Sequence, residues 1–376
     1  MLPDDAPIIS FDDHVIEHAD VWTDRLPAQY RDAGPRTVID DDGIRIWTYE
    51  GRRYQPLGLD AVAGDDPEEF KLTPKAFEDM RPGCYDPVAR LADMDEDGVH
   101  ASISFPQFPR FAGQTFVEAD DKELALRCVQ AWNDFVLDEW SAVDTSRLVP
   151  LSILPMWDPQ LCATEIRRVV EKGSKAVTFS ENPAALGLPS FWSEAWSPML
   201  AALEDTDTPM CLHIGSSSRP IVPHEDAPIP VVISLLNLLS MTAMSDLVFS
   251  PIFNRHPRLK VVLAECGIGW IPWMLERLEA TWTKQRHHSK INTEKTPREC
   301  FRDNMWACFI QEQAGIELRH HIGVDKILCE VDYPHSDTTW PNSRAWLRES
   351  LADVPDDEAR RIAGGNAAKL LKLAIR

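Results

Sequence analysis

The sequence predicts an α/β protein whose chain forms a (β/α)8 barrel, the TIM-barrel architecture. From about residue 87 onward, short apolar runs alternate with longer amphipathic runs, the pattern of parallel strands joined by crossover helices. One more apolar run near the N-terminus brings the number of units to eight, and 376 residues suit a closed barrel with insertions. An open doubly wound sheet would need an early glycine-rich turn, and none is present.

The expected strands are short apolar runs, and the expected helices carry apolar side chains at three- and four-residue steps. The strands are residues 8–12, 100–106, 148–154, 175–179, 209–214, 259–265, 305–310 and 326–332. The helices are residues 87–97, 121–140, 159–172, 193–203, 230–249, 270–282 and 315–322, with further helices up to the C-terminus.

Residues 20–86 break the alternation. This segment is rich in proline, glycine and charged residues, and residues 44–54 predict a small hairpin. We therefore expect one barrel domain over residues 1–376, with residues 20–86 inserted between the first strand and its helix. Loops at that position lie over the catalytic rim of a barrel, so a lid and a dimer contact are both expected roles.

The net charge of −22 excludes several classes of partner. Binding to nucleic acid or to anionic lipid needs clustered lysine and arginine, so neither is expected. No apolar stretch reaches the roughly 18 residues of a membrane helix, and no secretory signal is recognisable. The eight cysteines are spread singly without a C-x-x-C pair, which favours reduced core thiols and a cytoplasmic protein.

Ligand-type side chains lie at the ends of at least four expected strands. Asp12 and His14 are two residues apart on the first strand, so their side chains share one face. His213 closes the run that begins at Met210, and a glycine- and serine-rich loop ending at Arg219 follows it. Alone, each has a structural explanation, as a turn cap or as a histidine of the core.

Two carboxylates strengthen the pattern. Glu265 and Asp332 each follow a strongly apolar run, where a charged group is costly to bury without a partner. His335, three residues after Asp332, could reach the same rim. The carboxyl ends of parallel barrel strands meet at one rim, so we expect a metal site. The expected ligands are Asp12, His14, His213, Glu265 and Asp332.

A mixture of carboxylate oxygens and imidazole nitrogens suits Zn, Mn or Fe. Of these we expect Zn, with Mn or Fe as the alternatives, and either one or two bound ions. A metal with open positions can polarise a substrate oxygen or acidify a bound water.

The sequence resembles the amidohydrolase superfamily, in the branch that includes the aminocarboxymuconate-semialdehyde and resorcylate decarboxylases. The resemblance extends over nearly the whole chain. It rests on the D-x-H start and on the motifs RLADMDEDGVHASISFP, LHIGS, GIGWIPWMLERL and DYPHSD. It implies a distorted (β/α)8 barrel, with Asp12, His14, His213 and Asp332 as metal ligands and Asp332 also handling a proton.

Two positions depart from the family pattern. Relatives carry a histidine where this chain has Glu265, which adds negative charge and puts a direct transfer of the decarboxylase mechanism in doubt. A metal-bridging lysine after the fourth strand is also absent. Glu181 lies there and is a candidate for a second metal ligand or a substrate contact, or else a solvated loop acid.

Three functions compete. The first expectation is a metal-dependent hydrolase, in which Asp332 takes a proton from a metal-activated water that attacks an ester, amide or lactone carbonyl. His335 or Arg219 would orient the substrate. The alternative is a non-oxidative decarboxylase of an aromatic or unsaturated acid, with Arg219 holding the carboxylate. The third is a barrel scaffold without activity. The replacement at Glu265 favours the hydrolase.

The expected partners are a small-molecule substrate and a second copy of the chain. Trp306 and Trp340 could line an apolar pocket, which would favour an aromatic or bulky apolar substrate. Large helical faces and the long insertion favour a homodimer.

Overall fold

The computed structural model describes residues 2–374 and confirms the barrel. Eight parallel strands form it, if β6 and β7 are taken as one strand interrupted at Pro150, which has no backbone N–H to donate. The strands are β1 Ile9–Val15, β5 Ala101–Pro106, β6 Leu148–Val149, β7 Leu151–Ser152, β8 Ala176–Ser180, β9 Met210–His213, β10 Val261–Ala264, β11 Met305–Phe309 and β12 Ile327–Cys329.

The barrel closes between its first and last strands. Backbone hydrogen bonds run from Asp332 N to Asp12 O (2.8 Å) and from His14 N to Tyr333 O (2.6 Å). These bonds involve the segment that follows β12, so closure brings the carboxyl ends of the first and last strands together. Two expected metal ligands of the first strand are thereby placed beside the last one.

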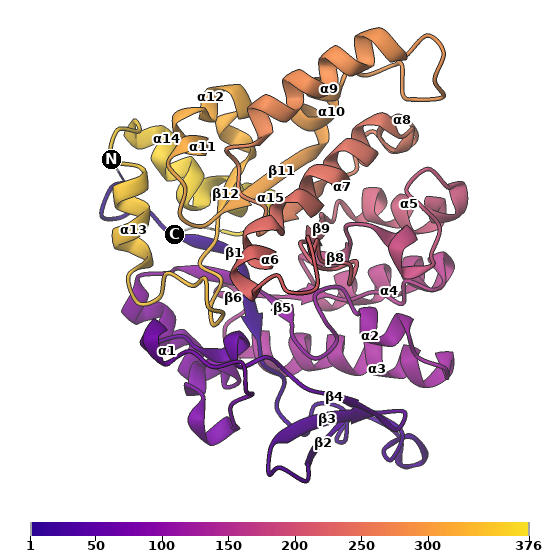
Figure 1. Ribbon diagram of the computed structural model, residues 1–376, viewed down its shortest axis with the longest axis vertical. Helices are drawn as coiled ribbons and strands as arrows, with labels where there is room; N and C mark the ends of the chain where they lie inside the picture. Colours follow the sequence, from indigo (N-terminus) through magenta and orange to yellow (C-terminus); the bar gives the residue numbers. More distant parts are fainter. Residues whose placement is uncertain (1, 375–376) are drawn as a thin grey trace.

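Helices surround the barrel (Figure 1). Their ends follow from local signals: α1 and α4 each begin at a proline after an aspartate that caps the helix, and each ends at a left-handed glycine. The helices are α1 Pro87–Asp97, α2 Gln114–Val117, α3 Lys122–Phe135, α4 Pro159–Lys172, α5 Ser197–Thr206, α6 Ile229–Leu235, α7 Asn237–Phe249, α8 Ile252–Arg255, α9 Ile271–Gln285, α10 Pro297–Asn304, α11 Ala314–Glu317, α12 Arg319–Ile322, α13 Ser343–Ser350, α14 Asp356–Arg360 and α15 Asn366–Leu371.

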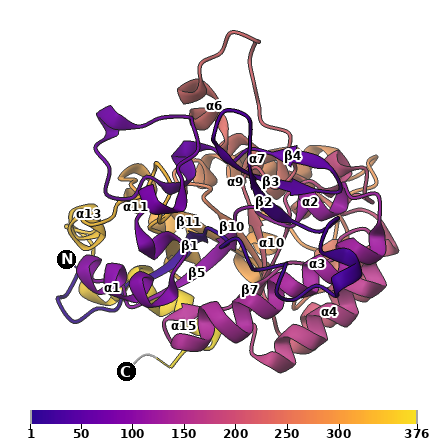
Figure 2. The ribbon, with the colours of Figure 1, turned by 90° about the horizontal axis from the view of Figure 1, so that it is seen from below.

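Residues 20–86 contain a second, antiparallel sheet of β2 Arg36–Ile39, β3 Arg45–Tyr49 and β4 Arg52–Tyr54. The expected hairpin is β3–β4, and its turn residues Glu50 and Gly51 both have positive φ. In Figure 2 this sheet lies on the upper side with α6, whereas α15 lies on the lower side.

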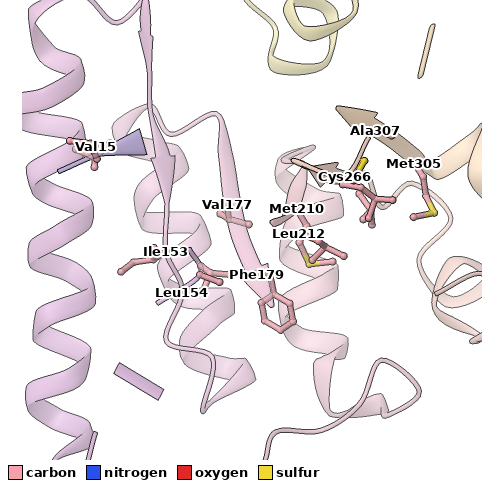
Figure 3. Close-up of a cluster of buried hydrophobic side chains, with 14 of the residues drawn as sticks. Val15, Ile153, Leu154, Val177, Phe179, Met210, Leu212, Cys266, Met305 and Ala307 are labelled. Atoms are coloured by element: carbon pink, nitrogen blue, oxygen red, sulfur yellow. The ribbon is translucent and has the colours of Figure 1, made fainter. Parts of the chain in front are cut away.

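Side chains alternate along the strands between two apolar clusters. Cys211 and Val262 belong to the cluster inside the barrel, which the apolar side of α15 joins at one end. Met210 and Leu212 belong to the larger cluster between barrel and helices, as do Val177 and Phe179 of β8 (Figure 3). This alternation orients His213, one residue after Leu212, toward the inside.

One segment, Ile229–Phe249, is long and apolar enough to cross a membrane by length and composition alone; it covers 21 residues, and an 18-residue stretch within it has a mean hydropathy of 1.8. Polar residues such as Asn237 and Ser240 interrupt its apolar run, in keeping with the expectation from the sequence. Part of this segment belongs to the core, since α7 buries Met244 and Leu247 and packs against α9 and α10.

The variant Phe179→Ala tests the packing of the larger cluster between the barrel and the helices. Phe179 is fully buried and meets Trp196 edge to face, with ring centroids 5.0 Å apart. We expect Phe179→Ala to lower the free energy of unfolding by about 3–5 kcal/mol through lost burial and a cavity. Chemical denaturation measures it. Trp273→Ala, at a side chain 60% exposed on α9, is the control and should change stability by less than about 0.5 kcal/mol. Equal effects would contradict the assigned packing.

Candidate metal centre at the barrel mouth

The strand β1 supplies two buried ligand-type side chains, Asp12 and His14. The pairing of β1 with β5 shifts register between Ser10 and Asp13, an irregularity of the bulge type. Ile9 and Phe11, before it, belong to the barrel interior. The shift turns the next alternate positions, 12 and 14, toward the mouth.

His213, Glu265 and Asp332 converge on the same point. The Nε2 atom of His14 lies 3.3 Å from Nε2 of His213, 3.5 Å from Asp12 Oδ1 and 3.3 Å from Asp332 Oδ1. Nε2 of His213 lies 3.2 Å from Asp12 Oδ2 and 3.3 Å from Glu265 Oε2. All five residues expected from the sequence thus form one cluster.

The cluster fits a divalent cation. Both carboxylate oxygens of Asp12 and of Asp332 are buried without a hydrogen-bond partner in the described residues 2–374. Burying such atoms is costly unless a further partner, such as a cation, binds them. Ligands held about 2.0–2.2 Å from one ion lie roughly 3.0–3.5 Å from each other, which matches the observed separations.

His213 has its tautomer set by the backbone. Its Nδ1 lies 2.6 Å from the carbonyl oxygen of Ile214. A carbonyl oxygen only accepts, so Nδ1 carries the hydrogen and Nε2 presents its lone pair to the cluster. A neutral imidazole with this tautomer is a ready metal ligand.

The electrostatics of the cluster also favour a cation. Burial raises the pKa of Asp12, Glu265 and Asp332 well above their usual values, and neighbouring carboxylates raise them further. Burial also lowers the pKa of His14 far below its usual value, with the two nearby imidazoles contributing. No lysine or arginine forms an ion pair with these three carboxylates in residues 2–374. A bound cation would remove this cost.

The backbone is strained at two of these positions. Glu265 has φ of 52° and Asp332 has φ of 57°, in the left-handed region that non-glycine residues rarely adopt. Strain of this kind persists only when the surrounding structure enforces it, and it concentrates at functional sites. Asp13 contributes here, since its Oδ1 accepts hydrogen bonds from Ser10 Oγ (2.8 Å) and from Tyr333 N (3.2 Å).

His335 lies against the cluster. Its ring stacks on His14 with centroids 3.6 Å apart, and its Nδ1 is 3.1 Å from Asp332 Oδ1. Its Nε2 is 3.0 Å from Oε1 of Gln107, a residue that follows β5. Burial lowers the pKa of His335 to about 4, so the ring is neutral. The position suits a group that orients a substrate or moves a proton.

Two other candidates lie elsewhere. Glu181 is buried, not solvated, and its carboxylate accepts hydrogen bonds from Ser216 and Ser217, so it fixes the loop after β9. The two groups of potential metal ligands in the described residues are Asp12–His14–His213 and His14–Asp332–His335. Within residues 2–374 Glu181 belongs to neither and has no contact with them, whereas Glu265, also outside both, contacts His213. Arg219 is exposed at the end of that loop and lines neither of the two cavities at the mouth, contrary to its expected role on the substrate.

The two tryptophans expected near a pocket also lie elsewhere. The Nε1–H of Trp306 donates to Asp325 O beside the start of β12, the other end of the barrel. Trp340 is buried against Tyr333. Neither lines a cavity at the mouth.

Sequence reasoning missed Glu330, although it lies two residues before Asp332 and alternation therefore puts the two side chains on the same face. Its Oε2 accepts a hydrogen bond from Glu265 N (3.0 Å), and both residues line a cavity of about 510 Å³ at the mouth. Gln107 and Arg90 were also missed. Arg90 is fully buried and donates to His14 O (2.5 Å), so it supports the end of β1. A charged residue within the apolar stripe of residues 87–97 was the available signal.

Comparisons with known proteins agree on the family. A family model described as Amidohydrolase matches residues 17–373. A gamma-resorcylate decarboxylase from a Polaromonas species is 26% identical over 76% of this chain and 86% of its own length. The 2-amino-3-carboxymuconate-6-semialdehyde decarboxylase of Dictyostelium discoideum is 24% identical over 80% of each.

Solved structures share the fold. An amidohydrolase from Mycobacterium avium subsp. paratuberculosis has a TM-score of 0.76 at 22% identity, covering 98% of this chain and all of its own. A 5-carboxyvanillate decarboxylase from Novosphingobium aromaticivorans, solved with manganese, has a TM-score of 0.69 at 16% identity and covers 98% of both chains.

The expected hydrolase is wrong. The curated relatives found are decarboxylases, so they support the carboxy-lyase alternative better than the hydrolase. Glu265 does not decide between the two reactions, because its carboxylate contacts His213 in the same cluster as the other ligand-type residues. A divalent metal site is supported, whereas zinc in particular is not.

Adding a metal ion to the metal-free protein tests whether this cluster binds a cation. We expect Mn²⁺ added to chelator-stripped protein to raise the thermal midpoint, since an ion at 100 times its dissociation constant stabilises by about 2.7 kcal/mol. Differential scanning fluorimetry measures it. His213→Ala should abolish the rise. The control is His256→Ala, because His256 is a buried histidine that pairs with Glu204 outside the cluster. A rise retained in His213→Ala would place the ion elsewhere.

Proposed function

Because the chain belongs to the Amidohydrolase family, we propose that it is a metal-dependent, non-oxidative decarboxylase of an aromatic or unsaturated carboxylic acid. The cluster of unpartnered carboxylate oxygens and imidazoles at the barrel mouth is the observation that carries the proposal. The decarboxylases among its relatives support the reaction class. All eight cysteines are free and buried, which favours the cytoplasm as its location.

The proposed ligands are Asp12, His14, His213 and Asp332, with Glu265 as a fifth. Three carboxylates against two imidazoles favour a hard ion, and we propose Mn²⁺ rather than Zn²⁺, one ion per chain. Three of the similar decarboxylase structures contain manganese. When bound, such an ion would supply positive charge for the substrate's carboxylate and an adjacent oxygen.

The residues of the chain would handle the proton. In the reaction the bond between the substrate carbon and its carboxylate breaks, carbon dioxide leaves, and the electron pair stays on the carbon, which takes up one proton. Asp332 and His335 are the proposed source, because Nδ1 of His335 lies 3.1 Å from Asp332 Oδ1. Gln107 would orient His335 through the contact at its Nε2.

Asp332 provides the test of this function. Asp332→Asn keeps the shape of the side chain but removes a charge and a proton site, so we expect carbon dioxide release to fall at least 10³-fold with the fold intact. Release from a panel of hydroxybenzoates, including 2,6-dihydroxybenzoate, measures it, and circular dichroism checks the fold. Asp325→Asn, at an exposed residue next to β12, is the matched control. Full activity of Asp332→Asn would remove Asp332 from the reaction.

We also infer a homodimer. The helix α6 has no buried residue, and Ile229, Val231 and Leu238 are exposed apolar side chains on it and on the first turn of α7. A second copy of the chain would cover them. We expect a dimer in sedimentation velocity that Val231→Asp weakens, whereas Val143→Asp, at an isolated exposed valine, leaves it intact. A monomeric wild-type protein would refute the inference.

A further inference from the structure

A second cavity, of about 310 Å³, lies between the insertion and the barrel mouth. One wall is formed by Ile16 and Glu17, just past β1, and by Gln107 and Phe108, just past β5. The opposite wall comes from β3, β4 and the residues up to Met80. The cavity therefore adjoins the same rim that carries Asp12 and His14.

A short chain of contacts joins this cavity to the metal cluster. Gln107 lines the cavity and contacts His335, whose ring stacks on His14. Asp60, from the insertion, lines it as well, and its carboxylate is hydrogen-bonded by Gln107. His335 and Gln107 therefore lie between the metal cluster and this cavity.

The cavity wall is largely apolar and aromatic. Trp47 and Phe108 face each other with ring centroids 4.7 Å apart, and Phe77 and Ile46 line the cavity beside them. The aromatic faces suit a flat apolar group, which would gain burial and ring contacts there.

The positively charged side chains that line the cavity differ in how strongly they already pair with other residues of the chain. Arg110 donates to Glu118 (2.9 and 2.7 Å) and to Ser218 (2.8 Å), and Lys75 pairs with Asp65. Arg45 has a loose ion pair with the exposed Glu78 (3.9 Å) and lies over the Phe77 ring, 5.6 Å from its centroid, and its Nε is buried without a hydrogen-bond partner in the described residues.

The acids of the wall do not compete for Arg45. Glu17 accepts hydrogen bonds from Gln107 N, Phe108 N and Trp132 Nε1, so its carboxylate is already satisfied. Asp60 is held by Gln107 and by Leu57 N. Arg45 is thus the wall cation that is free to meet a ligand.

We propose that this cavity is a substrate-recognition pocket for an aromatic ring that carries an anionic group, with Arg45 binding that group. This inference rests on the proposed function and narrows its substrate to an elongated aromatic acid with a second acidic group, remote from the carboxylate that is lost. The guanidinium of Arg45 would donate to the remote anion, while Trp47 and Phe108 hold the ring.

Two matched probes test the pocket in metal-depleted full-length protein, so that a metal cannot supply the cation. Biphenyl-4-carboxylate and biphenyl-4-carboxamide have the same body and differ in charge. We expect calorimetric titration to give at least tenfold tighter binding of the carboxylate. Arg45→Met should remove this preference, and Trp47→Ala should weaken both probes at least tenfold. Arg53→Met, at an arginine of β4 that pairs with Asp40 and does not line the cavity, should keep the preference.

Equal affinities of wild type for the two probes, or a preference that survives Arg45→Met, would overturn the inference. Probe binding is measured without metal or turnover, so it separates the two proposals. If neither the hydroxybenzoates nor elongated aromatic acids with a second acidic group release carbon dioxide but the probes show the Arg45-dependent preference, the pocket stands and the decarboxylase proposal fails. If carbon dioxide is released but the preference is absent, only the pocket fails.

Discussion

Two buried carboxylates and a partly buried third, close together at the barrel mouth, are the constraint on which the site depends. Asp12, Glu265 and Asp332 converge there on two imidazoles, without an ion pair to lysine or arginine in residues 2–374. Burying an uncompensated ion costs several kcal/mol even after relaxation. The folded chain therefore accepts a locally unfavourable arrangement, which a bound divalent cation would make favourable. The cluster thus has the chemistry of a metal centre before any reaction is considered.

The surrounding structure holds these groups in place. Arg90, buried beneath the end of β1, donates to the carbonyl of His14, and Asp13 binds the backbone of the segment after β12. The left-handed backbone at Glu265 and Asp332 persists because the neighbouring strands and hydrogen bonds enforce it. The fold thus uses ordinary packing energy to keep ligand atoms a few ångströms apart, which is the preorganisation that a catalytic metal requires.

The proposed selectivity for the substrate comes from a different part of the structure than the metal cluster. The metal cluster comes from barrel strands, whereas the apolar cavity is roofed by the insertion that breaks the barrel pattern. His335 and Gln107 lie between the two. One part of the chain can therefore vary the substrate while the other preserves the reaction, the division that barrel enzymes commonly show.

The sequence by itself determined the barrel, the boundaries of α1 and α4, and the cluster of five residues, because period-two and helical patterns and capping residues act locally. It also carried the family resemblance. Only the tertiary structure decided that Glu330 joins the mouth and that Glu181 binds serines. The bulge after Ser10, the left-handed turn at Asp332 and the exposure of Arg219 likewise depend on contacts between residues far apart in sequence. The cavity beneath the insertion depends on the same long-range packing, so no local pattern could reveal it.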